Sequence, residues 1–138
     1  MTLGLSDAVA VLAAQPFSRL LGTRVTRFDT EGVVLELDIA DQHRQQAGLV
    51  HGGVYAYLVD NAAAFAAGTA IGPRLVSTNT SLTLVNGVRE GTLRAHAVVQ
   101  HAERGQAVCM VTVSAVAPDG TETVCALGQG TAVATGGR

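Results

Sequence analysis

Apolar and polar residues alternate along much of the chain, as they do in half-buried β-strands. Over 33–39 every second residue is Val, Leu or Ile, and over 93–101 Leu, Ala and Val recur with the same period. The stretch 75–85 is rich in Thr and Val, which favour strands. Short glycine-containing turns between consecutive strands imply antiparallel pairing. The predicted strands are 23–28, 33–39, 75–85, 93–101, 107–116 and 123–134.

One long segment departs from this alternation. Between Gly52 and Pro73 the only Asp, Glu, Lys, Arg or His is Asp60. So apolar a run, opened by two glycines and followed by Gly72 and a proline, predicts a buried helix over about 53–69. Such a helix must be covered on most of its surface, and a strongly curved sheet covers it most simply. We therefore predict an α+β fold, with a curved antiparallel sheet wrapped around one long central helix.

The N-terminal segment contains an apolar run of Ala, Val and Leu that superficially resembles the core of a signal peptide. No basic residue precedes this run, and Asp7 stands immediately before it. A helix within 1–15, with Ser6 as its cap, is the better interpretation. We expect 16–21 to form a connecting turn and 135–138 to form a frayed tail.

Composition narrows the class of protein. The 138 residues fit one domain, 1–138, and 48% of them are hydrophobic while only 14% are charged. So few charges suggest that a second subunit covers part of the apolar surface. The net charge of −2 and the scattered arginines argue against nucleic-acid binding, and no uncharged apolar run reaches the ~18 residues of a membrane span. Cys109 and Cys125 lack metal-ligand spacing and are interpreted as free, buried thiols of a cytoplasmic protein, and the histidines form no metal-binding set.

The candidate chemistry lies at the start and in the middle of the predicted helix. A carboxylate such as Asp60 is costly within an apolar helix unless it has a partner or a task. The helix is preceded by the motif Q-x-x-G-x-x-H-G-G, which begins at Gln45, and Asp60 follows its histidine by nine residues. This motif, with the predicted order of elements, resembles the hotdog-fold acyl-CoA thioesterases, most closely the branch of the phenylacetate-pathway thioesterase. The resemblance extends over about 16–134.

The resemblance implies hydrolysis of an acyl- or aryl-CoA thioester to a free acid and coenzyme A. Coenzyme A is then part of the substrate, and no separate cofactor or metal is expected. It also implies a homodimer with paired sheets and shared active sites, often paired further into a homotetramer. The sequence does not name the acyl group.

The residues themselves support a reaction at a carbonyl group. Gly52 and Gly53 let the backbone approach a ligand closely. The free N–H groups at a helix start favour an oxygen that gains negative charge, so the N–H of Gly53 is expected to polarise the thioester carbonyl. Asp60 is the only carboxylate on the helix, and it acts either as the nucleophile or as the base that activates water.

Spacing along the helix predicts how these groups are assembled. Seven residues separate Gly53 from Asp60, which amounts to about 10 Å along the helix axis. One helix cannot place both groups at the same thioester carbon. Two antiparallel helices from two subunits can, because each Asp60 then faces the Gly53 of the other chain. The spacing therefore predicts a two-fold dimer with shared sites.

Further site residues are expected from the resemblance. Gln45 stands where the family usually carries Asn and sometimes Gln, to position water or to contact the thioester, and His51 is expected to hydrogen-bond the loop or the substrate. Some relatives carry Ser or Thr one helical turn after the carboxylate, where this chain has Ala64. Ser77 or Thr78, at the entrance to the next strand, is the expected substitute.

Two arginines are candidates for binding the coenzyme A phosphates. Arg89 lies in the sequence 88–91, which resembles the loop that the family has before its fourth strand, and Arg104 lies in a predicted turn. Both are proposed from charge and loop placement alone. The preceding Asn86–Gly87 replaces the Arg-Pro that is common in the family.

Alternative functions remain open at this stage. A non-catalytic acyl-CoA-binding module would share the fold but would not require Asp60. A hotdog dehydratase would pair a catalytic histidine with a carboxylate in a proline-flanked motif that this chain lacks. Asp60 could also be structural, capped by Asn61 or by a hydroxyl. Tyr55 and Tyr57 lie on different faces of the helix, one expected at the acyl pocket and the other at the subunit interface.

Overall fold

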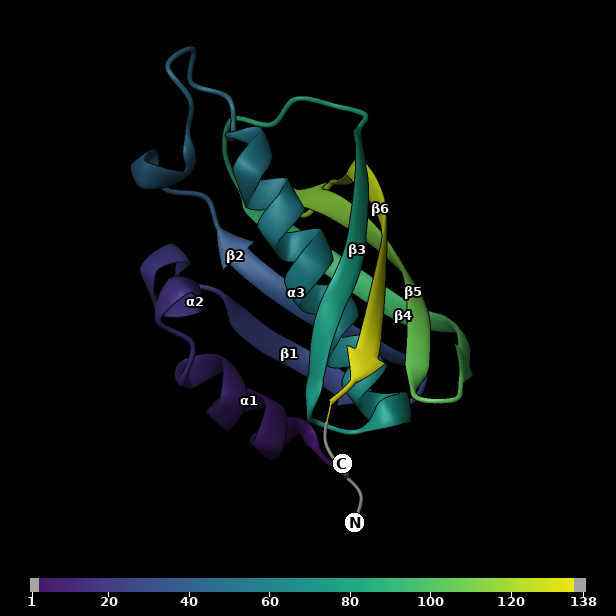
Figure 1. Cartoon of the computed structure of the whole chain (residues 1–138). Helices are drawn as coiled ribbons and strands as arrows, with labels where there is room; N and C mark the ends of the chain where they lie inside the picture. Colours follow the sequence, from purple (N-terminus) through teal and green to yellow (C-terminus); the bar gives the residue numbers. More distant parts are fainter. Residues whose placement is uncertain (1–2, 136–138) are drawn as a thin grey trace.

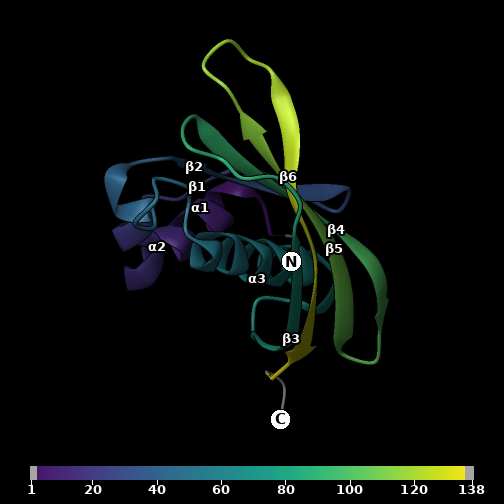
Figure 2. The same cartoon turned by 90° about the horizontal axis from the view of Figure 1, so that it is seen from above.

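The apolar central segment forms the long helix α3, Gly52–Ile71, which lies across one face of a curved sheet and contacts all six of its strands (Figures 1 and 2). The computed structural model describes residues 3–135. Two short helices, α1 and α2, pack at the side of the sheet next to its first strand. The elements are α1 Leu5–Ala13, α2 Pro16–Leu21, β1 Arg24–Asp29, β2 Gly32–Asp38, the 3-10 turn Asp41–His43, α3, β3 Leu75–Leu84, β4 Thr92–Glu103, β5 Gln106–Val116 and β6 Glu122–Ala134.

The sheet order is β1-β2-β4-β5-β6-β3, and every neighbouring pair is antiparallel. This confirms the predicted architecture. The predicted strands and central helix agree with the observed bounds to within two residues at each end. Helix α3 ends as expected at Gly72, whose φ is +89°.

The N-terminal region differs from the prediction in two ways. Residues 16–21 form a helix rather than a turn, because Pro16 supplies a helical φ at its first position and Gly22, at φ +80°, ends it in the left-handed conformation. Helix α1 begins at Leu5, before the expected cap Ser6. Its cap is Gly4, whose N–H donates to the carboxylate of Asp7 at 2.8 Å.

At the C-terminus the expected frayed tail is wrong for Thr135, because its N–H donates to the carbonyl of Arg74 at 2.8 Å. The remainder of that tail, 136–138, lies outside the described residues.

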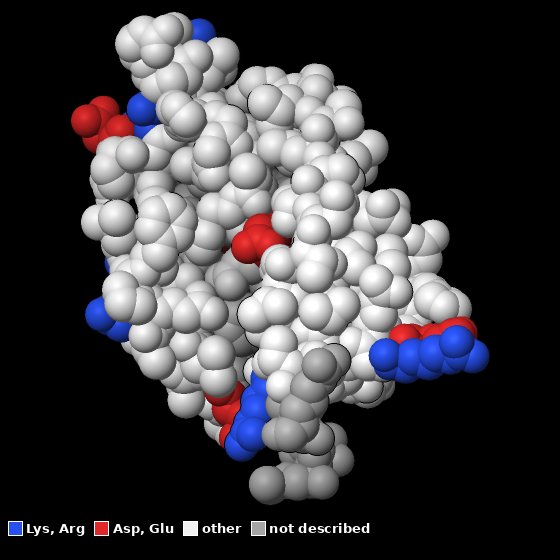
Figure 3. All heavy atoms as spheres, viewed as in Figure 1, with Lys and Arg blue, Asp and Glu red and all other residues white. Residues whose placement is uncertain are grey.

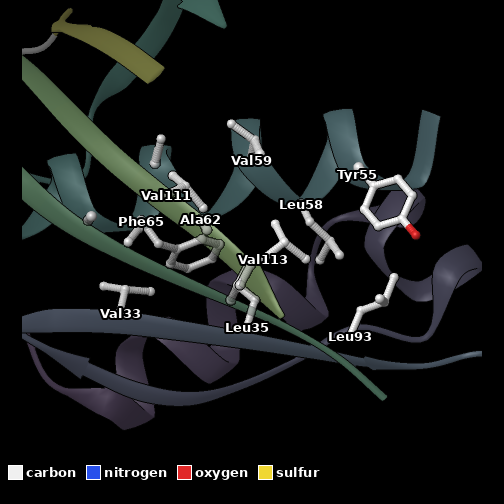
Figure 4. Close-up of a cluster of buried hydrophobic side chains, with 14 of the residues drawn as sticks. Val33, Leu35, Tyr55, Leu58, Val59, Ala62, Phe65, Leu93, Val111 and Val113 are labelled. Carbon is white, nitrogen blue, oxygen red and sulfur yellow. The ribbon is translucent and has the colours of Figure 1, made fainter. Parts of the chain in front are cut away.

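Helix α3 packs closely because small residues line its contact with the sheet. Its buried side includes Leu58, Val59, Phe65 and several alanines, and the side chains of Leu58 and Phe65 extend toward the strands in Figure 4. Strand β6 contributes glycines at the closest approach. A Cβ built at Gly128 would lie 2.5 Å from a methyl of Val59, and Gly130 faces Ala63 in the same way. The backbone of β6 therefore approaches α3 only because these positions carry no side chain.

The two edges of the sheet differ in chemistry. Strand β1 carries Arg24, Arg27 and Asp29, which form ion pairs on its surface. Strand β3 has no charged residue, and its Val76 and Leu84 are more than half exposed. Charges and prolines are the usual protection of an edge strand against pairing with another chain. Within residues 3–135 β3 pairs only with β6, so its second edge is open and unprotected in this part of the chain.

Both cysteines are buried and unpaired, as predicted. Cys109 on β5 and Cys125 on β6 are fully shielded from solvent. Burial raises the pKa of each thiol to about 11. Neither side chain therefore has the thiolate character of a reactive cysteine.

Candidate active site

Asp60 lies in the middle of α3 and is half-buried, rather than enclosed in the core. The hydroxyl of Thr80 on β3 donates to Oδ1 of Asp60 at 3.1 Å. Among residues 3–135, no group donates a hydrogen bond to the second oxygen, Oδ2. The carboxylate thus has one oxygen that is held in place and one that is available to a substrate or a water.

Thr80 was missed in the sequence because a bulge changes which residues of β3 face the helix. With strict alternation, Leu75 and Ser77 would be followed on that face by Asn79. Instead the register with β6 shifts between Ser77 and Asn79, which leaves Thr78 as an extra residue on β3. The shift places Thr80 toward Asp60.

Ser77 and Thr78, the expected helpers, therefore do not hold the carboxylate. Ser77 lines a groove further along the helix, and the Thr78 hydroxyl donates to the backbone carbonyl of Thr131 at 3.4 Å. Ala64, one turn after Asp60, lines the same groove.

At the start of α3, the backbone N–H group that is free differs from the expected one. His51 is the N-cap residue, and its Nδ1 accepts the N–H of Gly53 at 2.9 Å. The ring proton is therefore on Nε2. In this structure the Gly53 N–H is occupied, whereas the N–H of Gly52 has no hydrogen-bond partner among the described residues. Gly52, rather than Gly53, presents the free donor at the positive end of the helix.

Gln45 mainly stabilises its own loop. Its side-chain carbonyl accepts the N–H of Ala47, and its backbone N–H donates to the carbonyl of Leu49 at 2.8 Å. The amide nitrogen of the Gln45 side chain donates no hydrogen bond to another described residue. This NH₂ group is the part of Gln45 that can reach a ligand.

Arg89 lies near the start of α3 and Arg104 does not. Arg89 Nη1 donates to the carbonyl of Ala47 at 2.9 Å, and Val50, next to His51, donates its N–H to the carbonyl of Val88 at 2.8 Å. The loop before β4 is thereby attached to the loop that leads into α3. Arg104 is in the β4–β5 turn, which the strand register places at the opposite end of α3.

The two reactive halves of the site are separated within one chain. Gly52 and Asp60 are eight residues apart on a continuous helix, which corresponds to about 12 Å along its axis. A thioester carbon bound at one of them is beyond the reach of the other. In a single chain the structure therefore contains two half-sites.

A groove of about 280 Å³ runs along α3, and its lining includes Asn61, the residue after Asp60. It lies between α1, α3 and the beginning of β3, and Ala64 and Phe65 form part of its wall. On the face of the molecule shown in Figure 3, charged side chains lie mostly at the margin, with one acidic group in a hollow near the centre. The surface around the half-site is therefore largely uncharged.

The tyrosines of α3 differ from the expectation at the acyl pocket, which neither of them lines. Tyr55 is buried in the core, where burial raises its pKa to about 12. Tyr57 packs edge-on against Phe17, and its hydroxyl donates to Oγ1 of Thr23 at 2.9 Å. Neither ring lines the groove.

The histidines do not form a metal site. No group of His, Cys, Asp and Glu within residues 3–135 has the arrangement of metal ligands. His43 is buried, with Nδ1 accepting the N–H of Ala40 and Nε2 donating to the carbonyl of Leu21 at 2.8 Å. It secures the loop before α3. His96 is exposed on β4, as expected.

Comparisons with known proteins identify the family of the chain. The family model of the thioesterase superfamily matches residues 47–122, which include the start of α3, Asp60 and Thr80. A Mycobacterium tuberculosis protein assigned provisionally as an esterase is 30% identical over 119 residues, covering 83% of this chain and 82% of its own length. None of the helices in the described part of the chain has the length and hydropathy to cross a membrane.

Solved structures of thioesterase-superfamily proteins have the same fold as this chain. A thioesterase family protein from Silicibacter pomeroyi superposes with a TM-score of 0.87 at 25% identity, over 97% of this chain and 100% of that one. Zebrafish thioesterase superfamily member 2 superposes with a TM-score of 0.83 at 26% identity, with the same coverage. The fold is the hotdog fold. The chain belongs to the thioesterase superfamily.

Proposed function

We propose that this protein is an acyl-CoA thioesterase of the phenylacetate-pathway branch, which hydrolyses an acyl- or aryl-CoA thioester to a free acid and coenzyme A. The observation that carries the proposal is Asp60. Its carboxylate is held by Thr80 on an otherwise apolar helix and keeps one oxygen accessible beside a groove. A binding module without catalysis has no need of such a group.

In the proposed reaction the thioester carbonyl accepts a hydrogen bond from the Gly52 N–H at the start of α3. This donor and the helix dipole stabilise the negative charge that develops on the oxygen. Asp60 either takes a proton from the water that attacks the carbonyl carbon or attacks that carbon itself. The C–S bond then breaks, and the sulfur leaves as coenzyme A thiolate, which takes up a proton. When Asp60 itself attacks, the acyl group remains on its carboxylate as a mixed anhydride until a water molecule hydrolyses it, so both routes give the free acid and coenzyme A.

A homodimer completes the site. The open, uncharged edge of β3 supports pairing with β3 of a second copy across a two-fold axis. Such pairing sets two α3 helices antiparallel, so that Asp60 of one subunit meets Gly52 of the other. Hotdog thioesterases are commonly oligomeric. Further pairing of dimers to a tetramer is part of the proposal.

The loops around the start of α3 are proposed to bind the thioester and the coenzyme A. The free NH₂ of Gln45 contacts the thioester or the attacking water. His51 orients the helix start through its bond to Gly53. Arg89, already attached to this loop, binds phosphate groups of coenzyme A. Arg104 lies at the other end of the helix and would contribute only from another subunit.

The test is release of coenzyme A, measured with a thiol-trapping reagent. The panel contains acetyl-, butanoyl-, phenylacetyl- and benzoyl-CoA. We expect turnover of at least one of them by the wild type and almost none by Asp60→Ala. The matched control Asp119→Ala removes a carboxylate from the exposed β5–β6 turn and should retain full activity. Binding of these thioesters without turnover, or full activity of Asp60→Ala, would contradict the proposal.

A further inference from the structure

The groove beside Asp60 is built for a small occupant. Ala64 lies four residues after Asp60 and therefore one turn further along the same face of α3. It opens the groove, and Gly68 continues it without a side chain, while Phe28 and Phe65 form apolar walls. In the single chain the volume of about 280 Å³ lies just below the range of about 300–1,000 Å³ for ligand sites, which suits a short acyl group better than a long chain.

Within residues 3–135 the groove offers nothing to bind a negative charge. No Lys, Arg or His of this part of the chain lines it, and its one charged side chain there is Asp7 on α1. Asp7 accepts the N–H of Gly4, so its negative charge is fixed at the rim of the groove. An acyl group that ends in a carboxylate would meet repulsion without compensation.

Two amide side chains of the lining belong to a fixed polar network. The Nδ2 of Asn61 lies 3.2 Å from Oε1 of Gln15, 3.2 Å from the hydroxyl of Tyr57 and 3.4 Å from that of Ser18. Ser18 is 1% exposed and donates to Oε1 of Gln15 at 2.6 Å. The network joins α2 and its N-cap residue Gln15 to α3 and fixes the orientation of both amides.

The same network leaves one acceptor and one donor unused at the groove. Oδ1 of Asn61 accepts no hydrogen bond, and Nε2 of Gln15 donates none, among the described residues. Both residues line the groove. A hydroxyl group, which donates once and accepts, matches this pair.

We propose that the groove holds the acyl part of the thioester and that Asn61 and Gln15 select short, uncharged acyl groups that carry a hydrogen-bonding substituent such as a hydroxyl. This inference rests on the proposed thioesterase function and names its substrate class. Asn61 and Gln15 determine specificity, while the reaction itself takes place at Asp60.

The experiment compares kcat/KM for butanoyl-CoA with kcat/KM for its 3-hydroxy and 4-hydroxy derivatives. We expect the wild type to prefer at least one hydroxylated substrate by about tenfold, the effect of one well-made hydrogen bond. Asn61→Leu and Gln15→Met should each reduce that preference toward one, because kcat/KM falls more for the hydroxylated substrate than for butanoyl-CoA. Succinyl-CoA and dodecanoyl-CoA should be poor substrates of the wild type.

The control Thr23→Val removes one of the partners of the Tyr57 hydroxyl, its acceptor, without changing a residue that lines the groove, so it should keep the preference. Affinities for non-hydrolysable thioether analogues of the butanoyl and hydroxybutanoyl substrates, measured by calorimetry, should show the same ratios. Absence of turnover would refute the proposed function alone, since these affinities still test selectivity. A ratio of hydroxylated to plain analogue near one, or one that Asn61→Leu leaves unchanged, would overturn the inference.

Discussion

Replacing Gly52 by proline would remove a single N–H from the proposed site. Gly52 is the first residue of α3, where proline is favoured because its φ is helical and its missing N–H would be unpaired. The preceding residue His51 has φ −64° and ψ 137°, the extended conformation that a residue before proline prefers. A Cβ at Gly52 would meet only Leu84, at an ordinary 3.6 Å. The helix should therefore accept the change.

The expected effect follows from the role of the donor. Loss of one oxyanion-stabilising hydrogen bond lowers kcat by about 100- to 1,000-fold. Gly52→Ala keeps the N–H and should stay within a few-fold of the wild type. Thermal unfolding of both variants should be close to that of the wild type. Thermally stable Gly52→Pro with full activity would refute the assignment of Gly52.

Mixing Gly52→Pro with Asp60→Ala then tests whether sites are shared. After random exchange of subunits, half of the dimers are mixed, and each mixed dimer has one intact site of two. Activity should therefore return to about one quarter of the wild-type value. If both groups of a site came from the same chain, no mixed dimer would contain an intact site. Verified subunit exchange without recovery of activity would exclude the shared site.

Three further predictions concern residues whose roles the structure defines. Thr80→Val should lower kcat by about tenfold, since the hydroxyl holds the carboxylate that is proposed to be catalytic. Thr80→Ser should restore most of the rate, and equal rates for the two variants would contradict this role. Gly130→Val should destabilise the protein by about 1–3 kcal/mol in urea unfolding, because the new side chain would overlap α3. Gly68→Ala should stabilise the protein by about 0.5–1 kcal/mol, because its Cβ would lie 4.0 Å from its nearest neighbour. The opposite order of stabilities would show that the helix can move off the sheet. Burial raises the pKa of the Cys109 and Cys125 thiols from 9.0 to about 11. The stability that they contribute is therefore fully present below pH 9 and is lost as the pH rises through 11. The urea midpoint should fall over that range, and it should fall by less when both cysteines are replaced by alanine.

The fold could be predicted from local patterns because most of its elements have a recognisable pattern within a short stretch of sequence. Alternation with period two marks the strands, and one apolar run closed by Gly72 marks the central helix. The exception is α2, a six-residue helix too short to show a period, where Pro16 at the start and Gly22 at the end were the available signals.

The site could be predicted only in part. Asp60 stood out as a charge in an apolar segment, and His51 marked the start of the helix. The donor atom differed from the expectation because a side chain, Nδ1 of His51, takes the Gly53 N–H and leaves that of Gly52 free. A sequence shows which backbone groups a helix start leaves unpaired, but not which of them a neighbouring side chain then occupies.

The sequence by itself determined the strands, the long helix, the carboxylate on that helix and the spacing that predicts a site divided between two chains. These depend on hydrophobic period and on the rise per residue, which are local properties. The tertiary structure alone decided that Thr80 holds Asp60, because a bulge at Thr78 changes which residues of β3 face the helix. It also brought Ser18 and Asn61, 43 residues apart, into one network beside the groove. Contacts of this kind depend on how elements distant in sequence pack together, and no short-range pattern in the sequence predicts them.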